Sequence, residues 1–115
     1  MTSSQSGTLS RGASANAARG EAALVVAGET LVLRPSFEAL VAAEEDLGPL
    51  FALVERAAEG GLKLGEMGAL FWHCVSARPE HCTREKVGAA IAEAGLAKVT
   101  PVLKVLLTQI LQGHV

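Results

Sequence analysis

The stretch EAALVVAGETLVLR, residues 21–34, contains two aliphatic runs separated by Gly28-Glu29. A Gly-X pair suits the two-residue loop of a type II′ turn, because glycine readily adopts the positive φ that the first loop position requires. With this loop, Val26 faces Leu31 across a β-hairpin. Side-chain alternation then gathers four aliphatic residues on one face: Leu24, Val26, Leu31 and Leu33. Since a lone hairpin is marginally stable in water, this face is expected to cover helices.

The other face of the hairpin carries Val25 and Val32, beside Ala23 and Arg34. Both edges of a two-stranded hairpin leave backbone groups unpaired, so each edge could accept a strand from a partner or from another copy of the chain. Val25 and Val32 are therefore candidates for protein interaction, and packing within the domain is the alternative.

The remainder of the chain follows helical spacing and predicts about five short helices. Residues that cap, stop or break helices set the expected boundaries. They are an N-cap at Ser36, stops at Gly48-Pro49 and Gly60-Gly61, a third helix from Gly65 to about Ala77 that ends before Arg78-Pro79, a cap at Thr83 and a stop at Gly95. Phe37 and Phe51 belong to the apolar stripes of the first two helices.

The last expected helix, LAKVTPVLKVLLTQILQ at residues 96–112, has a wide apolar face. Pro101 either stands at its first position after a Thr100 cap or kinks a longer helix that begins near Leu96. Part of the apolar face could lie in a groove or cover a partner helix. The candidates for this interaction are Leu103, Leu107 and Leu111. Burial in the core is the competing explanation, because a small domain needs that apolar area.

Together these elements predict an α+β fold that is mostly α, in which an N-terminal two-stranded β-hairpin packs on a bundle of about five short helices. The length of 115 residues suits one core, so residues 21–115 are expected to form a single domain. Residues 1–20 are rich in Ser, Ala and Gly and are predicted to form a disordered tail.

Composition argues against several classes of protein. The net charge of −2 is unlike that of nucleic-acid-binding proteins, which usually carry a strong basic excess. The sequence lacks a charge-free apolar run of about 18 residues, so no membrane span is expected. The N-terminus has no apolar signal-peptide core, and two cysteines without a secretion signal indicate free thiols in a reducing cytoplasm.

Histidine and cysteine cluster in FWHCVSARPEHC, residues 71–82, where the candidate metal ligands are His73, Cys74, His81 and Cys82. A zinc site needs four converging ligands, and this spacing differs from the common zinc motifs. His73 and Cys74 project about 100° apart on a helix, and Cys74 falls on an apolar stripe. Cys82 follows His81 near a helix N-terminus, but no orienting acid or oxyanion motif accompanies it. We therefore expect a helix end and a loop, with no metal, cofactor or catalytic residue.

Several short segments follow one another in an order that carries a family resemblance. They are Arg19-Gly20-Glu21, the hairpin around Gly28, Leu33-Arg34, Phe37-Glu38-Ala39-Leu40 and Glu44-Glu45, then LKLGEMGALFW at 62–72 and TREKVGAAIAEAGLAKVTPVLKVLL at 83–107. In this order they resemble the gene transfer agent family of phage-like tail proteins, over about residues 16–112. The long N-terminal tail and the His/Cys loop depart from the family's pattern.

The family is associated with defective-prophage particles that carry host DNA between bacteria, and its members are described as tail tube components or as tail assembly chaperones. The resemblance implies a non-enzymatic bacterial protein that acts in the cytoplasm during tail assembly or in the assembled particle. It implies protein partners, namely the tape-measure and major tail proteins or further copies of the chain, without nucleic acid, membrane or cofactor.

A tail assembly chaperone that binds the tape-measure protein is the favoured interpretation, since a tube subunit usually needs a larger sheet than one hairpin supplies. One alternative is a structural tail tube subunit. Another is a small zinc-dependent or redox regulatory module that uses His73, Cys74, His81 and Cys82.

Overall fold

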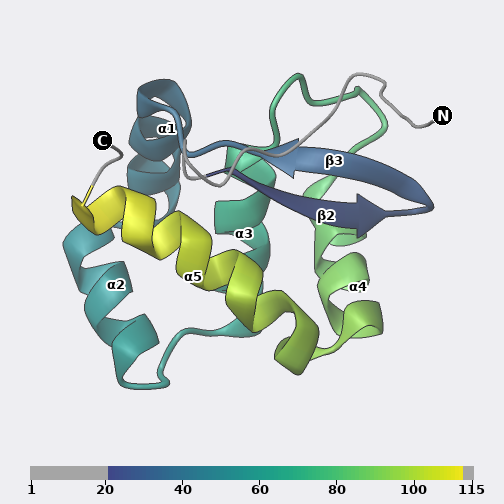
Figure 1. Ribbon diagram of the computed structural model, residues 1–115. Coiled ribbons are helices and arrows are strands. Elements are labelled where there is room, and N and C mark those ends of the chain that lie inside the picture. Colours follow the sequence, from purple (N-terminus) through teal and green to yellow (C-terminus); the bar gives the residue numbers. More distant parts are fainter. Residues whose placement is uncertain (1–20, 113–115) are drawn as a thin grey trace, which may run out of the picture.

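The computed structural model describes residues 21–112, and Figure 1 shows a two-stranded antiparallel sheet that lies along one side of a group of helices. The strands are β2 (Ala22–Val26) and β3 (Glu29–Leu33). The helices are α1 (Phe37–Leu47), α2 (Leu50–Ala58), α3 (Leu64–Cys74), α4 (Arg84–Ala94) and α5 (Leu96–Gln112). The predicted α+β, mostly α fold is confirmed within these residues. The predicted tail, residues 1–20, lies outside the part of the chain that the structure describes.

The hairpin turn lies one position earlier than expected, because its loop is Ala27-Gly28. Both loop residues have positive φ, 51° at Ala27 and 81° at Gly28, as a type I′ turn requires. The predicted type II′ turn is therefore wrong, and Val26 pairs with Glu29 instead of Leu31. Moving the loop by one residue shifts every pairing by two positions, which preserves the alternation. The four aliphatic side chains predicted to share a face are accordingly all buried.

The outer edge of β3 is partly occupied by the segment that follows α3. α3 ends at Cys74 rather than near Ala77, and Val75 forms an antiparallel bridge with Leu33. Ser76 N donates to the Val32 carbonyl at 2.8 Å, and Arg34 N donates to the Cys74 carbonyl at 2.7 Å, so both segments supply donors to this pairing. The expectation of two open hairpin edges is therefore wrong for β3, whereas β2 pairs only with β3 among residues 21–112.

Two capping hydrogen bonds confirm the predicted helix starts. The Ser36 hydroxyl accepts a hydrogen bond from Ala39 N at 3.2 Å, at the beginning of α1. The Thr83 hydroxyl accepts one from Lys86 N, also at 3.2 Å, at the beginning of α4. Each hydroxyl satisfies a backbone N–H that has no partner inside the helix.

α5 is the longer of the two helices that the sequence allowed, because it begins at Leu96 and contains Pro101. Pro101 has no N–H to donate, so the helix loses one hydrogen bond at this point. The Thr100 hydroxyl is not the cap of a shorter helix. It donates to the Leu96 carbonyl at 2.6 Å, one turn earlier in the same helix.

The core surrounds α3, which contacts both α1 and α4. Leu70 and Phe71 of α3 are fully buried. β2 contacts α4 and α5, so helices from the end of the chain cover the hairpin at its beginning (Figure 1). Within residues 21–112, no helix is long and apolar enough to pass through a membrane.

The apolar stripes of α1 and α2 lie only partly against the core. Phe37 is 82% exposed and Phe51 is 74% exposed. The fully buried residues of these helices are instead Ala43 and Leu53. Both rings therefore lie outside the core, and these helices meet it through other positions of their apolar faces.

The type I′ turn predicts opposite effects on stability for substitutions at its two central residues. Asn tolerates positive φ better than Ala, so Ala27→Asn should stabilise the protein, by about 0.5–1 kcal/mol. Gly28→Ala should destabilise it by about 1 kcal/mol, because the new Cβ meets no atom within 4 Å and only the φ of 81° opposes it. Thermal unfolding of both variants checks this. A destabilising Ala27→Asn change would contradict the assigned turn.

Candidate protein-binding groove

An apolar groove runs between α2 and α5. The two helices run in opposite directions, lie nearest where α2 begins and α5 ends, and diverge toward their other ends (Figure 1). A hollow of about 420 Å³ lies between them, and a second of about 310 Å³ adjoins it. Val54 and Leu111 line both hollows, which therefore form one continuous surface, here called the α2–α5 groove.

The wall supplied by α5 contains the three leucines predicted as interaction residues. Leu103 is buried at the base of the groove, Leu107 is half-buried, and Leu111 is exposed at its rim. Their spacing of one helical turn places them in one row along α5. The core-burial explanation thus applies to Leu103, while Leu107 and Leu111 remain accessible to a partner.

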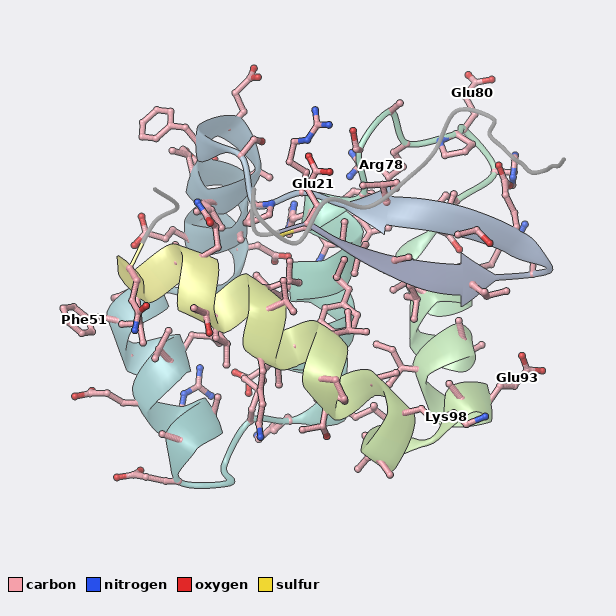
Figure 2. All side chains as sticks on the ribbon, viewed as in Figure 1. Glu21, Phe51, Arg78, Glu80, Glu93 and Lys98 are labelled. Carbon is pink, nitrogen blue, oxygen red and sulfur yellow. The ribbon has the colours of Figure 1, made fainter. Side chains whose placement is uncertain are left out.

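The wall supplied by α2 was not predicted. Val54, Ala57 and Ala58 face α5 across the groove, and Leu50 and Phe51 line its other end. The sequence places these residues on the apolar stripe of the second helix. Figure 2 shows the Phe51 side chain projecting outward from α2. An apolar stripe shows that a helix is amphipathic, but it does not show whether the chain itself covers that stripe.

The structure does not bring Val25 and Val32 into the groove. Val25 is 58% exposed on β2, whereas Val32 on β3 is 8% exposed. The two residues are not direct cross-strand partners either, because Val25 pairs with Thr30 and Val32 pairs with Ala23. Val25 remains a candidate interaction residue, at a site separate from the groove.

Another hollow is polar, and its arginine side chains already have partners. It measures about 530 Å³ and lies between the start of α1 and the segment after α3. Arg34 Nε donates to the nearly buried Glu21 carboxylate at 2.6 Å. Arg78 stacks 3.7 Å from the Trp72 ring centre and donates to the Trp72 carbonyl. Engaged guanidinium groups are weak ligands for a further anion, so we do not assign a site here.

The four His and Cys residues lie at the end of α3 and in the loop that follows it. His73 Nε2 lies 3.0 Å from Asp46 Oδ2, and His81 Nε2 lies 3.1 Å from Glu29 Oε1, so the two imidazoles have separate carboxylate partners. Both cysteine side chains are buried and unbridged: Cys74 and Cys82. Among residues 21–112, no three His, Cys, Asp or Glu side chains gather in a way that could hold a metal ion.

Burial also suppresses thiol chemistry. It raises the pKa of Cys74 to about 12, so this thiol is protonated at neutral pH. Burial raises the pKa of Cys82 as well. Because the thiolate is the nucleophile, neither side chain has the electrostatic setting of a reactive cysteine.

The structure is thus a small, mostly helical domain with an apolar groove that the described residues leave open. The family model for the phage tail tube protein, GTA-gp10, matches residues 19–113, and the chain belongs to this family. No curated protein and no solved structure matches the chain. The protein is therefore a phage-like tail protein of the gene transfer agent type, as the ordered segments in its sequence suggest, and its family is structural rather than enzymatic.

Asp46 predicts an acid-sensitive contact among α1, α3 and α4. Hydrogen bonding from His73, together with the Arg84 guanidinium 2.5 Å away, lowers the pKa of Asp46 below its ordinary value of 3.8. A carboxyl group whose pKa is lower in the folded state than in the unfolded state stabilises the fold at pH values above the unfolded-state pKa. This stabilisation disappears as the pH falls through the folded-state pKa. Asp46→Asn should lower the melting temperature at pH 7. Below about pH 4, the melting temperatures of the variant and the wild type should approach each other. Glu45→Gln, at the exposed neighbouring position, is the control, and an equal effect of both variants would contradict the prediction.

A second prediction separates the groove rim from the core on one helix. Phe51→Ala should change the free energy of unfolding by less than about 0.5 kcal/mol, because the ring is largely exposed. Leu53→Ala should cost about 2–5 kcal/mol, because it leaves a cavity at a fully buried position. Chemical denaturation measures both values. A large loss for Phe51→Ala would mean that the ring belongs to the core.

Proposed function

We propose that the protein is a tail assembly chaperone that binds the tape-measure protein and keeps its apolar segments soluble until the tail tube forms. The open α2–α5 groove is the observation that carries this proposal. Its walls are aliphatic along most of their length, and Leu111 and Phe51 at its rim are exposed large apolar residues. Adjoining apolar hollows with exposed rims are typical of surfaces that another chain covers.

The small sheet supports the chaperone over a tube subunit. The described sheet contains two strands, and the segment after α3 occupies part of the β3 edge. A tube wall built by joining sheets would need longer and more numerous strands than these. We further propose that the protein acts in the bacterial cytoplasm, with the tape-measure and major tail proteins as its partners.

A structural tail tube subunit is the second candidate. The family's own description as a tail tube protein favours it. The outer edge of β2 also supports it, because this edge pairs with no other strand among residues 21–112 and Val25 is exposed beside it. Such a subunit would polymerise through β2, whereas a chaperone would use the groove.

Co-expression with the tape-measure protein, followed by affinity purification, tests the chaperone. The expected result is co-purification that Leu111→Gln weakens about tenfold, because a buried leucine contributes about 1.5–3 kcal/mol. Leu96→Gln is the matched control, since Leu96 is an equally exposed leucine (58% against 53%) outside the groove on the same helix.

Light scattering of the purified chain separates the two candidates. Growth into rings or fibres at high concentration, without capture of the tape-measure protein, would support the tube subunit and overturn the chaperone. Capture that Leu111→Gln and Leu96→Gln weaken equally would remove the groove as the binding site.

A further inference from the structure

The α2–α5 groove has the length of a short helix. Its α5 wall extends from Thr100 to Leu111. At a rise of 1.5 Å per residue this wall is about 16 Å long, or about three helical turns. Ala57 and Ala58 on the opposite wall are small, so the backbone of a third helix could approach α2 closely. An extended strand would leave its backbone groups unpaired against these apolar walls, whereas a helix satisfies them internally.

The two rims of the groove carry opposite charges. Lys104 lines the α5 side, and the charged residues of α5 are Lys98 and Lys104, both cationic. On α2, Glu55 is exposed and lines neither hollow. It lies one turn from both Phe51 and Ala58, so helix geometry places it on the outer flank of α2, beside the groove.

Neighbouring charges do not cancel this difference. Arg56, next to Glu55, is engaged by Glu66 of α3 at 2.5 Å. Neither Lys104 nor Glu55 forms an ion pair with another residue of the described chain, 21–112. The α5 rim is therefore cationic and the α2 rim is anionic, and both charges are available to a partner.

We propose that the groove binds an amphipathic α-helix of about three turns whose apolar stripe is flanked by acidic residues on one side and basic residues on the other. The acidic flank faces Lys104 and the basic flank faces Glu55. This inference rests on the proposed function, and it defines the chemistry of the tape-measure segment that the chaperone would hold. Bound in this way, the segment forms a three-helix arrangement with α2 and α5.

Three stapled helical peptides of about 14 residues test the proposal with the full-length protein. All share one stripe of leucine and alanine. The mixed peptide has glutamates on one flank and lysines on the other, a second has glutamates on both flanks, and a third has lysines on both. The mixed peptide should bind about threefold more tightly than either of the others in fluorescence anisotropy, the range expected of an exposed ion pair. This preference should vanish in about 0.5 M salt, which screens exposed charges.

Lys104→Glu makes both rims acidic, so the tightest ligand should change from the mixed peptide to the peptide with lysines on both flanks. Lys98→Glu is the matched control. Lys98 lies near the N-terminal end of α5 and does not line the groove (Figure 2), so this change should leave the order of peptide affinities unchanged. Equal binding of the three peptides, no binding of any, or the same change of order in Lys98→Glu would overturn the proposal.

The peptide assay and the co-purification test the two proposals separately. A chain that discriminates among the peptides as expected but does not capture the tape-measure protein would retain the groove chemistry and lose the proposed partner. Capture of the tape-measure protein without discrimination among the peptides would retain the proposed partner and overturn the proposed groove chemistry. A dimer in light scattering that Lys104→Glu dissociates would assign the groove to a second copy and overturn the amphipathic-helix proposal.

Discussion

The structure depends on covering the aliphatic face of the β2–β3 hairpin. A two-stranded hairpin is not stable alone in water, and neither are helices as short as α1 and α2. The hairpin begins the described chain, while α4 and α5, which contact β2, end it. Leu33 is completely buried and also bridges to Val75 after α3. Folding therefore joins the two ends of the described chain, and the elements become stable together.

This arrangement explains why a groove remains at one side. α5 directs its buried residues Val99, Leu103 and Leu106 inward. α2 is attached mainly to α1, and by Arg56 to Glu66 at the start of α3. Since α5 leans toward the hairpin and α2 follows α1, the flanks of these two helices diverge (Figure 1). The apolar side chains along them are partly covered, which leaves a surface that a further helix would complete.

The His/Cys segment has a structural explanation in the same framework. Trp72 Nε1 donates to the Cys82 carbonyl at 3.1 Å, and Arg78 and Arg84 both lie over the indole ring. Arg84 and His73 both contact Oδ2 of Asp46, so one cluster connects the loop after α3 to α1 and α4. Of the residue types that suit metal binding, His73 of α3 contacts Asp46 of α1, and His81 of the loop contacts Glu29 of β3. The spacing in the sequence already argued against zinc, but only the contacts show what these side chains do.

The sequence by itself determined the element types, the helix starts at Ser36 and Thr83, and the aliphatic face of the hairpin, because each depends on residues within about one helical turn or on the parity of alternation. It also carried the family resemblance and the row of Leu103, Leu107 and Leu111. Only the tertiary structure decided that α3 ends at Cys74, since Val75 is drawn into pairing with the distant Leu33. It likewise decided that Phe37 and Phe51 lie outside the core and that α2 supplies the second wall of the groove. Sequence periodicity shows that a helix has an apolar side. How much of that side is buried depends on the packing of elements that are distant in the sequence.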